Sequence, residues 1–365
     1  MYKLIVSIVF GCFISITVSA QNNSNFSDSI KKIEFFNNIE SYSEALQTAL
    51  QSEKLLADSS ALNIQYFFVC GQAANGLGKD SLAIRYFNQA LLLDSQLVSV
   101  KKAIAIIEYR LGNIESSVNL FQKILKENEL AASERSWLAK IYTEQGDISS
   151  AIKVVQSRPA LHENHFKLMH LEAKLLIMNK YYSYGLTIYA QLIERKPDDL
   201  NLKNEYIKAL FKSGKWQEVI DLAQELYLID PNSELAFIIG SSYEYLNNSK
   251  RALEWFQWAA TNCIDPSIDV YYSYAGLSAE RIMDYKTAIQ MYQKAIRYNS
   301  QNGYHQFFLA KCYDITGQTA QAQKYFERFL KSEQATENEE FTAFAKQQLE
   351  HYKVVKFMTV EKDSL

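Results

Sequence analysis

A spacing of 34 residues between glycines is the feature that most constrains how this chain can fold. Gly78, Gly112 and Gly146 follow one another at this interval, and Gly214 stands at twice the interval. Residues five positions after these glycines also correspond to one another: Ala83, Ser117, Ala151 and Val219. Self-similarity at such a period is typical of a solenoid, in which one supersecondary unit is repeated and each copy packs on its neighbours. We therefore expect one elongated array rather than two or three globular domains.

The composition favours helices. The 365 residues include only 12 glycines and 4 prolines, and they are rich in residues that favour helix formation. The 24 tyrosines and 20 phenylalanines need an explanation. Because paired helices need bulky side chains to fill the layers between them, we assign most of these rings to packing; an aromatic ligand site is the alternative.

Residues 1–20 have the form of a secretory signal peptide. Lys3 precedes an apolar stretch over residues 4–18, and the small residues Val-Ser-Ala precede Gln21. The apolar stretch is too short for a comfortable membrane span, and no later stretch approaches 18 apolar residues. We therefore expect an exported chain without an integral membrane span, in the periplasm or cell envelope, or secreted.

A lipoprotein-type cleavage site is the alternative interpretation of this segment, with lipid on Cys12 of Val-Phe-Gly-Cys. The bulk of Phe10 and the apolar residues 13–18 that would follow cleavage argue against it. Loss of residues 1–20 removes one lysine and no acidic residue, so the net charge changes from −3 to −4. Such a charge gives no indication of nucleic-acid binding.

Three cysteines remain beyond the signal segment: Cys70, Cys263 and Cys312. An odd number in an exported protein could indicate a free thiol or an intermolecular disulfide. Cys70, however, falls at a buried position of its helix, several repeats away from the other two. We interpret the three as small buried hydrophobic residues.

The repeats resemble those of the tetratricopeptide repeat family. That family has a small residue at position 8, a turn near 15, Ala at 20, an aromatic residue at 24 and Ala at 27. The clearest match starts at Ile64, with Gly71, Gly78, Ala83, Phe87 and Ala90 in those positions. The units that keep this phase are 64–97, 98–131, 132–165, 166–199, 200–232, 233–266, 269–302 and 303–336, after a divergent first unit near 26–61.

The resemblance implies an all-α, right-handed superhelical solenoid of about nine helix-turn-helix repeats. We expect a linker and the divergent repeat over 21–61, the array over 64–336, a C-terminal capping helix over 337–358 and a frayed tail over 359–365. Two irregularities stand out: two extra residues near 263–267, and Pro159, which removes the usual end of a second helix.

No catalytic signature interrupts the repeats. The sequence lacks a glycine-rich phosphate loop, an HExxH pair, paired CxxC motifs and a nucleophile elbow. His162, His165 and His170 lie close together, but no cysteine is near them, so we expect ordinary surface histidines. We therefore predict a protein that is not an enzyme and has neither a cofactor nor a metal.

The family resemblance also implies a binding groove, lined by positions 2, 5, 9, 12 and 13 of the first helices. The residues that we assign to this groove are Lys140, Lys167, His170, Lys174, Asn201, Asn204, Lys208, Phe211, Lys212, Tyr245, Tyr304, Phe307 and Lys311. Asparagines could hold the backbone of an extended peptide, and lysines could attract its acidic groups. Alternatively, the lysines only solvate a helix face.

The groove lacks the pattern that grips a terminal carboxylate in the best-known peptide-binding members of the family. His170, Lys174 and Glu205 stand where that pattern needs other residues. We predict a scaffold or adaptor that binds a protein or peptide segment, in assembly at a bacterial envelope. The alternative is a module that binds glycan or cell wall through its aromatic rings; self-association is left open.

Overall fold

The computed structural model describes residues 23–55, 60–160, 165–263 and 266–362. The chain divides into two compact units, with the division between Leu175 and Leu176. All regular structure in the described residues is helical. The predicted signal peptide and Cys12 lie outside these residues. Every described helix is too short or too polar to cross a lipid bilayer.

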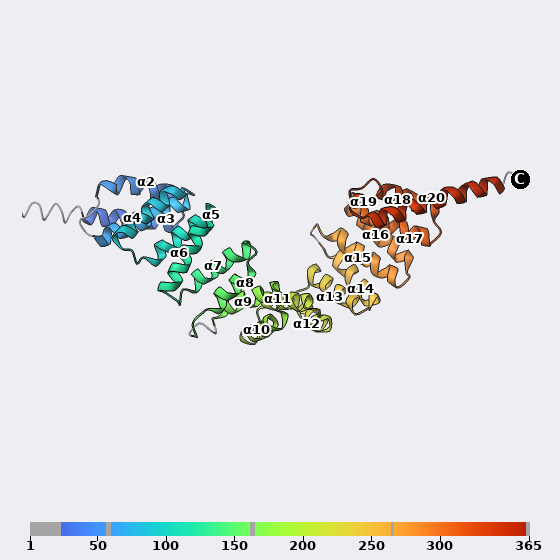
Figure 1. Ribbon diagram of the computed structural model, residues 1–365, viewed down its shortest axis with the longest axis horizontal. Helices are drawn as coiled ribbons and strands as arrows, with labels where there is room; N and C mark the ends of the chain where they lie inside the picture. Colours follow the sequence, from blue (N-terminus) through green and yellow to red (C-terminus); the bar gives the residue numbers. More distant parts are fainter. Residues whose placement is uncertain (1–22, 56–59, 161–164, 264–265, 363–365) are drawn as a thin grey trace, which may run out of the picture. The chain divides into compact units, whose positions relative to one another are not determined.

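The first unit consists of antiparallel helices connected by short turns (Figure 1). Its helices cover 23–38, α2 (Tyr42–Ser52), a 3-10 turn (Glu53–Leu55), α3 (Ser60–Gly76), α4 (Asp80–Leu93), α5 (Val98–Arg110), α6 (Ile114–Glu127), α7 (Ala132–Glu144) and α8 (Ile148–Gln156). Helix α9 (Phe166–Met178) contains the division between the units.

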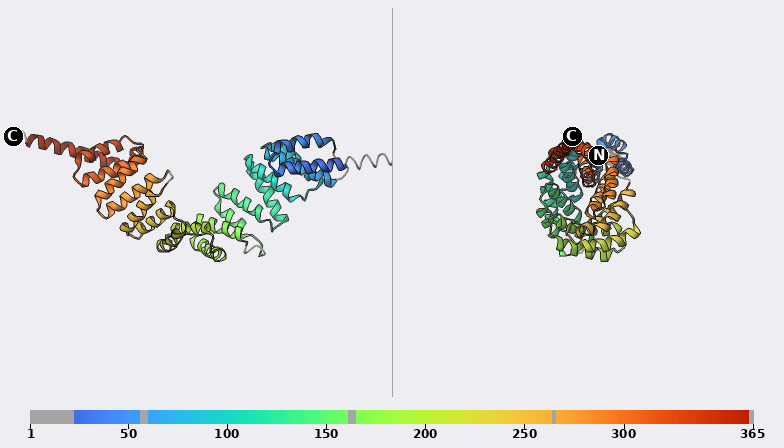
Figure 2. Two further views of the ribbon diagram at one scale, coloured as in Figure 1. Left: turned by 180° about the vertical axis from the view of Figure 1, so that it is seen from behind. Right: turned by 90° about the vertical axis from the view of Figure 1, so that its right-hand side faces the viewer.

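The second unit repeats the same arrangement (Figure 2). It contains α10 (Tyr182–Arg195), α11 (Leu200–Lys212), α12 (Trp216–Ile229), α13 (Ser233–Tyr245), α14 (Ser249–Thr261), α15 (Ile268–Arg281), α16 (Tyr285–Tyr298), α17 (Gly303–Ile315), α18 (Thr319–Phe329), α19 (Gln334–Glu337) and α20 (Glu339–Lys362). Successive helices pack as consecutive pairs, so the predicted all-α solenoid of helix hairpins is confirmed.

Small residues let the two helices of a hairpin approach each other. A Cβ atom added to Gly276 in α15 would lie 2.7 Å from the ring of Tyr292 in α16, and one added to Gly240 would lie 2.9 Å from Phe256. Both rings are fully buried. The small residue at position 8 therefore makes room for the aromatic residue at position 24 of the same repeat. Cys70 and Cys312 are buried in the cores of the first and second units, as predicted, whereas Cys263 is only partly buried, so the prediction was wrong for that residue.

A residue with positive φ ends the first helix of most repeats. Five glycines do so, with φ between 68° and 83°: Gly78, Gly112, Gly146, Gly214 and Gly317. Asn247 takes the same conformation at φ 59°. Lys180 and Met283 also adopt it, at 63° and 61°, which the sequence did not indicate because neither residue favours this region.

Replacing Gly78 with alanine is expected to lower the free energy of unfolding by about 1 kcal/mol, because a Cβ atom is unfavourable at positive φ. Nothing lies within 4 Å of an added Cβ at this position, so the effect isolates backbone conformation from packing. Gly78→Asn is the matched control and should lose only a few tenths of that amount, since asparagine tolerates the left-handed region. Chemical denaturation measures both; equal losses would contradict the explanation.

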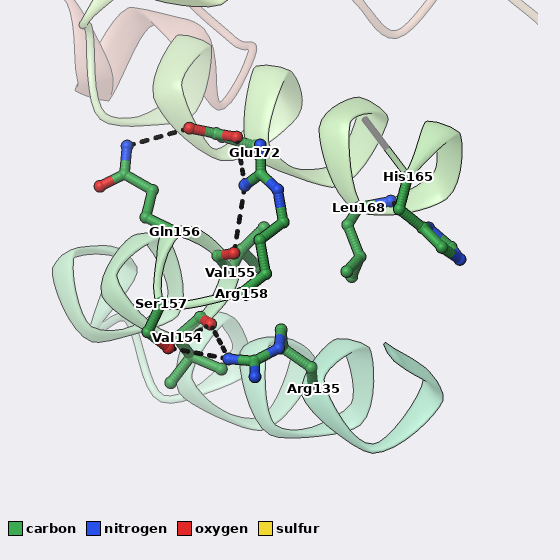
Figure 3. A network of polar contacts seen from close by, with 9 residues as sticks. All are labelled: Arg135, Val154, Val155, Gln156, Ser157, Arg158, His165, Leu168 and Glu172. Carbon is green, nitrogen blue, oxygen red and sulfur yellow. Dashed lines mark hydrogen bonds and ion pairs between the residues drawn. The ribbon is translucent and has the colours of Figure 1, made fainter. Parts of the chain in front are cut away.

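Helix α8 ends early, at Gln156, before Pro159, as the sequence predicted. Its terminal carbonyls are satisfied by two arginines (Figure 3). Arg135 from α7 donates to the carbonyl of Val154 at 2.7 Å, and Arg158 donates to that of Val155 at 3.2 Å. Arg158 also pairs with Glu172 of α9 at 2.7 Å. Guanidinium groups therefore take the place of the missing last turn.

Helix α20 packs against the end of the second unit. Phe341, Phe344, Leu349 and Tyr352 join the core cluster that contains α17 and α18. The helix continues to Lys362, so the first four residues of the segment expected as a tail are helical. Its apolar side chains cover the hydrophobic surface that the last hairpin would otherwise expose, as a solenoid requires at its end.

Candidate functional site

In the first unit, two predicted groove lysines lie together. Lys140 and Lys167 line a cavity of about 470 Å³, called the basic cavity here, with Ala132, Ser133, Ser136, Trp137 and His165. The Lys140 ammonium lies 4.7 Å from the Trp137 ring centre, in a cation–π contact. The cavity therefore combines an aromatic wall with positive charge.

The other predicted groove residues of this unit lie outside the basic cavity. His170 is half-buried with its ring 6.4 Å from that of Phe166, and Lys174 is exposed. His162 lies outside the described residues, so the structure does not describe the group of His162, His165 and His170 as a whole. Within the described part of the chain, no group of three or more histidines, cysteines or acidic residues could hold a metal ion.

The polar groove residues at the start of the second unit are only partly available for binding. Lys208 pairs with Glu234 at 2.7 Å, while Asn201 and Lys212 are exposed. The Oδ1 atom of Asn204 is buried without a hydrogen-bond partner among the described residues. Part of the positive charge that the sequence indicated is therefore neutralised within the protein.

Further along the second unit, aromatic residues form the wall of a deeper site. Tyr245 is 59% exposed and stacks on Trp216, with ring centres 4.0 Å apart and planes at 7°. Phe211 contacts both rings edge-on. These residues border a cavity of about 330 Å³, called the α13 cavity, lined by Phe211, Phe237, Ser241, Glu244, Tyr245, Phe256, Tyr274, Leu277 and Arg281.

A second cavity of about 320 Å³, called the α15 cavity, lies one repeat further on. Its lining is Val270, Ser273, Tyr274, Leu277, Tyr292, Asn302, Tyr304, His305 and Phe308. Tyr274 and Leu277 border both cavities, so the two adjoin along α13, α15 and α17; we refer to the pair as the groove. In each, the buried ring at position 24 of the hairpin contributes to the lining: Phe256 in one and Tyr292 in the other.

The charged side chains that line the α13 cavity, Glu244 and Arg281, form an ion pair with each other. Glu244 accepts hydrogen bonds from Ser278 and Arg281 of the next first helix, and from Ser249 at 3.1 Å. These contacts join α13 to α15. Glu244 is therefore engaged within the protein, and the surface left for a ligand is mainly the aromatic and aliphatic side chains.

Two residues that line the α15 cavity, Ser273 and His305, belong to a chain of three polar side chains that ends at Asp269 behind the lining. His305 is buried, and its Nε2 lies 2.9 Å from Asp269 Oδ2 while its Nδ1 lies 3.2 Å from Ser273 Oγ. The arrangement is reminiscent of a hydrolase, but Ser273 lies in the middle of α15, where backbone N–H groups are used by the helix. No backbone oxyanion hole can form beside it, so the trio is better suited to binding than to acyl transfer.

The last repeat requires one correction. Tyr304 borders the α15 cavity, but Phe307 is only 4% exposed and stacks on Phe341 of α20 at 4.3 Å. The assignment of Phe307 to the groove was wrong, because the capping helix covers that position. Lys311 pairs with Glu280 at 3.0 Å, and Glu280 also accepts a hydrogen bond from Tyr292. Burial and this acceptor raise the pKa of Tyr292.

Several lining residues were missed. Phe237 and Ser241 occupy positions 5 and 9 of their repeat, so the same positional rule could have found them. Tyr274 and Phe308 occupy position 6, which the rule does not include. His305 and Asp269 stand 36 residues apart on different hairpins, and no sequence motif connects them.

A cavity of about 880 Å³ shares Asn302 with the α15 cavity but is otherwise lined by other residues. It is lined by the polar loop between α16 and α17 and by the segment after α18: Asn299, Ser300, Gln301, Asn302, Gln306, Arg328, Lys331, Ser332, Glu333 and Gln334. All the residues that line it are polar or charged. Well-formed binding sites combine concave apolar walls with a few polar groups, which describes the groove better.

Comparison with known proteins agrees with this architecture. Residues 102–159 and 306–336 match models of the tetratricopeptide repeat. A TPR repeat-containing protein of Methanocaldococcus jannaschii is 26% identical over 309 residues, covering 80% of this chain and 48% of that protein. The chain thus spans about half the length of this curated relative.

Solved structures show the same fold. The C-terminal part of a TPR repeat-containing protein from Cytophaga hutchinsonii has a TM-score of 0.52 at 15% identity, covering 64% of this chain and 97% of that one. A tetratricopeptide repeat protein from Parabacteroides merdae has a TM-score of 0.48 at 18% identity, covering 70% and 99%. The two matched segments, residues 102–159 and 306–336, therefore carry tetratricopeptide repeats, and the Cytophaga hutchinsonii structure supports the shared fold alone.

Proposed function

We propose that this protein is a scaffold or adaptor that binds an extended protein segment in the groove of its second unit. The observation that carries the proposal is the pair of adjoining cavities that share Tyr274 and Leu277. Two apolar cavities in a row suit a segment that inserts two bulky side chains. A compact small molecule would fill only one of them.

The expected affinity depends on the surface that such a segment buries. Each large apolar side chain taken from water contributes about 1.5–3 kcal/mol, and association itself costs several kcal/mol. Two inserted side chains alone therefore give weak, reversible binding. Polar contacts along the segment must supply the remainder, and the exposed Asn201 and Lys212 on α11 are available for them.

Leu277→Arg tests the proposal, because this residue borders both cavities. The full-length chain would carry a photo-crosslinking residue at Tyr245, and mass spectrometry of native envelopes would identify the captured segment. We expect Leu277→Arg to lower capture at least about tenfold, since it places a charge where apolar side chains bind.

Leu228→Arg is the matched control, because Leu228 is 85% exposed on the second helix α12. It should leave capture unchanged, and circular dichroism should show that both variants are folded. If the two variants capture the partner equally, the groove is not the binding site. Preferential recovery of purified wall glycan over protein would instead support the glycan-binding alternative.

We propose that the basic cavity of the first unit binds acidic groups of the partner. Lys140 and Lys167 are both exposed beside Trp137, which suits a carboxylate on the same class of partner. Charge reversal of Lys174, Lys208 and Lys212 tests three of the other lysines that the sequence assigned to the groove. Capture that is unaffected by these changes would limit the site to the basic cavity and the aromatic cavities.

We also propose that the protein is exported and acts in the assembly of a bacterial envelope. The support is the signal-peptide pattern of residues 1–20 together with the scaffold fold. Mass spectrometry of the mature protein should find Gln21 as its first residue. If the first residue is instead a lipid-modified Cys12, the protein is anchored to a membrane rather than secreted. An intact Met1 would contradict export.

A further inference from the structure

The polar chain of Asp269, His305 and Ser273 indicates what kind of ligand side chain binds in the α15 cavity, because Ser273 and His305 line it. We propose that this cavity binds a tyrosine of the captured segment, with Ser273 Oγ accepting a hydrogen bond from the phenol hydroxyl. The inference rests on the proposed function and adds the identity of one bound side chain. Its evidence is the arrangement of Asp269, Ser273 and His305 between α15 and α17.

His305 holds Ser273 in place at the edge of the cavity. The imidazole is 3% exposed, and each ring nitrogen has a partner: Asp269 Oδ2 at 2.9 Å and Ser273 Oγ at 3.2 Å. Asp269 is itself buried. A serine within a helix often bonds to the carbonyl four residues earlier, whereas Ser273 turns towards His305. The hydroxyl is therefore positioned by a second helix.

Ser273 keeps at least one acceptor lone pair whichever way the hydrogen bond to His305 runs. If the imidazole is neutral with hydrogen on Nε2, Ser273 donates to Nδ1 and keeps two lone pairs. If it is protonated, Nδ1 donates to Ser273 and one lone pair remains. In both states Oγ can accept a hydrogen bond from a ligand in the cavity.

The remaining lining suits an aromatic ring with a polar tip. Tyr274, Tyr304 and Phe308 border the cavity, and rings of this kind favour edge-on or offset contact with another ring. Asn302 uses its Oδ1 to accept the backbone N–H of Tyr304 at 3.0 Å, which leaves its side-chain NH₂ to donate. A phenol both donates and accepts, whereas an indole only donates and a phenyl ring does neither.

The neighbouring cavity provides a contrast. The α13 cavity also contains a serine, Ser241, but no histidine borders it, and Glu244 and Arg281 are paired with each other. We expect it to take an apolar side chain. The volume of the α15 cavity, about 320 Å³, lies at the low end for small-molecule sites, which fits one side chain rather than a cofactor.

The test uses p-cresol and toluene, the side-chain analogues of tyrosine and phenylalanine. Each is titrated into the isotope-labelled full-length chain, and amide shifts at Tyr274 and Phe308 give the two dissociation constants. We expect p-cresol to bind more tightly than toluene. Ser273→Ala should reduce this preference by about threefold to tenfold, the effect of losing one hydrogen bond. Ser273→Thr, which retains the hydroxyl, should keep most of it.

Ser183→Ala, at an exposed position of α10 outside both cavities, is the control and should leave the preference unchanged. Toluene binding as tightly as p-cresol to the unaltered chain, or a preference that survives Ser273→Ala, would overturn the inference. So would the absence of shifts with either compound. The proposed function has a separate readout: if crosslinking from position 245 still depends on Leu277, the groove stands although the tyrosine assignment fails.

Discussion

Replacing Arg135 with methionine should lower the free energy of unfolding of the first unit by about 3 kcal/mol. The Arg135 side chain is buried, and it donates to Val154 O at 2.7 Å, Ser157 Oγ at 2.8 Å and Glu129 O at 3.0 Å. Methionine keeps the apolar stem and removes all three donors. A hydrogen bond to a charged group contributes about 1.5–3 kcal/mol. The loss is reduced because Glu129 and Ser157 are exposed to water and Val154 O keeps Ser157 Oγ as a donor at 2.9 Å.

The cost of burying the guanidinium group opposes this effect without cancelling it. Burial lowers the pKa of Arg135, and its Nε atom has no hydrogen-bond partner among the described residues. Removing the charge relieves that penalty. The expected loss is therefore placed at about 3 kcal/mol rather than at the sum of three charged hydrogen bonds.

Arg110→Met is the matched control for Arg135→Met. Arg110 also joins neighbouring hairpins, through Asp80 and Asn75, but its side chain is 45% exposed. Exposed ion pairs contribute about 0–1 kcal/mol. Denaturant titration measures both variants, and hydrogen exchange should show faster opening of α8 only in Arg135→Met. Similar losses in the two variants would mean that the end of α8 does not depend on its arginine.

Phe307→Ala should lower the free energy of unfolding of the second unit by about 3–5 kcal/mol, because it removes a fully packed aromatic ring. Phe307 lies within 6 Å of four rings that join α17 to α18 and α20: Phe326 at 5.9 Å, Phe329 at 5.1 Å, Phe341 at 4.3 Å and Phe344 at 5.9 Å. Loss of the ring should also release α20. Hydrogen exchange of α20 provides the measurement.

Phe35→Ala is the control for Phe307→Ala, because Phe35 is 58% exposed. It should cost less than about 1 kcal/mol. If Phe307→Ala were equally mild and α20 remained protected, Phe307 would not anchor the capping helix. The prediction that it lines an open groove would then regain support.

The repeat period predicted the helices closely. Helices α5, α7, α11, α13 and α17 begin at the first residue assigned to their repeats. This accuracy has a physical basis, since glycine, alanine and aromatic residues recur wherever two helices must approach. Helix α15 starts one residue early, at Ile268, just after the irregular segment near 263–267.

The groove was harder to predict, because the position of a residue within its repeat does not specify which element packs against that repeat. Phe307 occupies the same position as Phe237, which borders the α13 cavity. At the end of the array α20 takes the place of a further hairpin and covers Phe307. The Asp269–His305–Ser273 trio was not predictable either, since it depends on side-chain directions in two different repeats.

The shared wall between the two cavities has a consequence for how ligands of different length bind. Tyr274 is 42% exposed and contributes to both cavities. Tyr274 already contacts the rings of Phe237 and Phe256, and we expect a side chain bound in one cavity to remove rotamer freedom that the ring still has. The second side chain would then bind a ring already in place. The binding free energy of a segment that carries both side chains should therefore be more favourable than the sum for two single-residue ligands. The groove would then favour partners that fill both cavities at once.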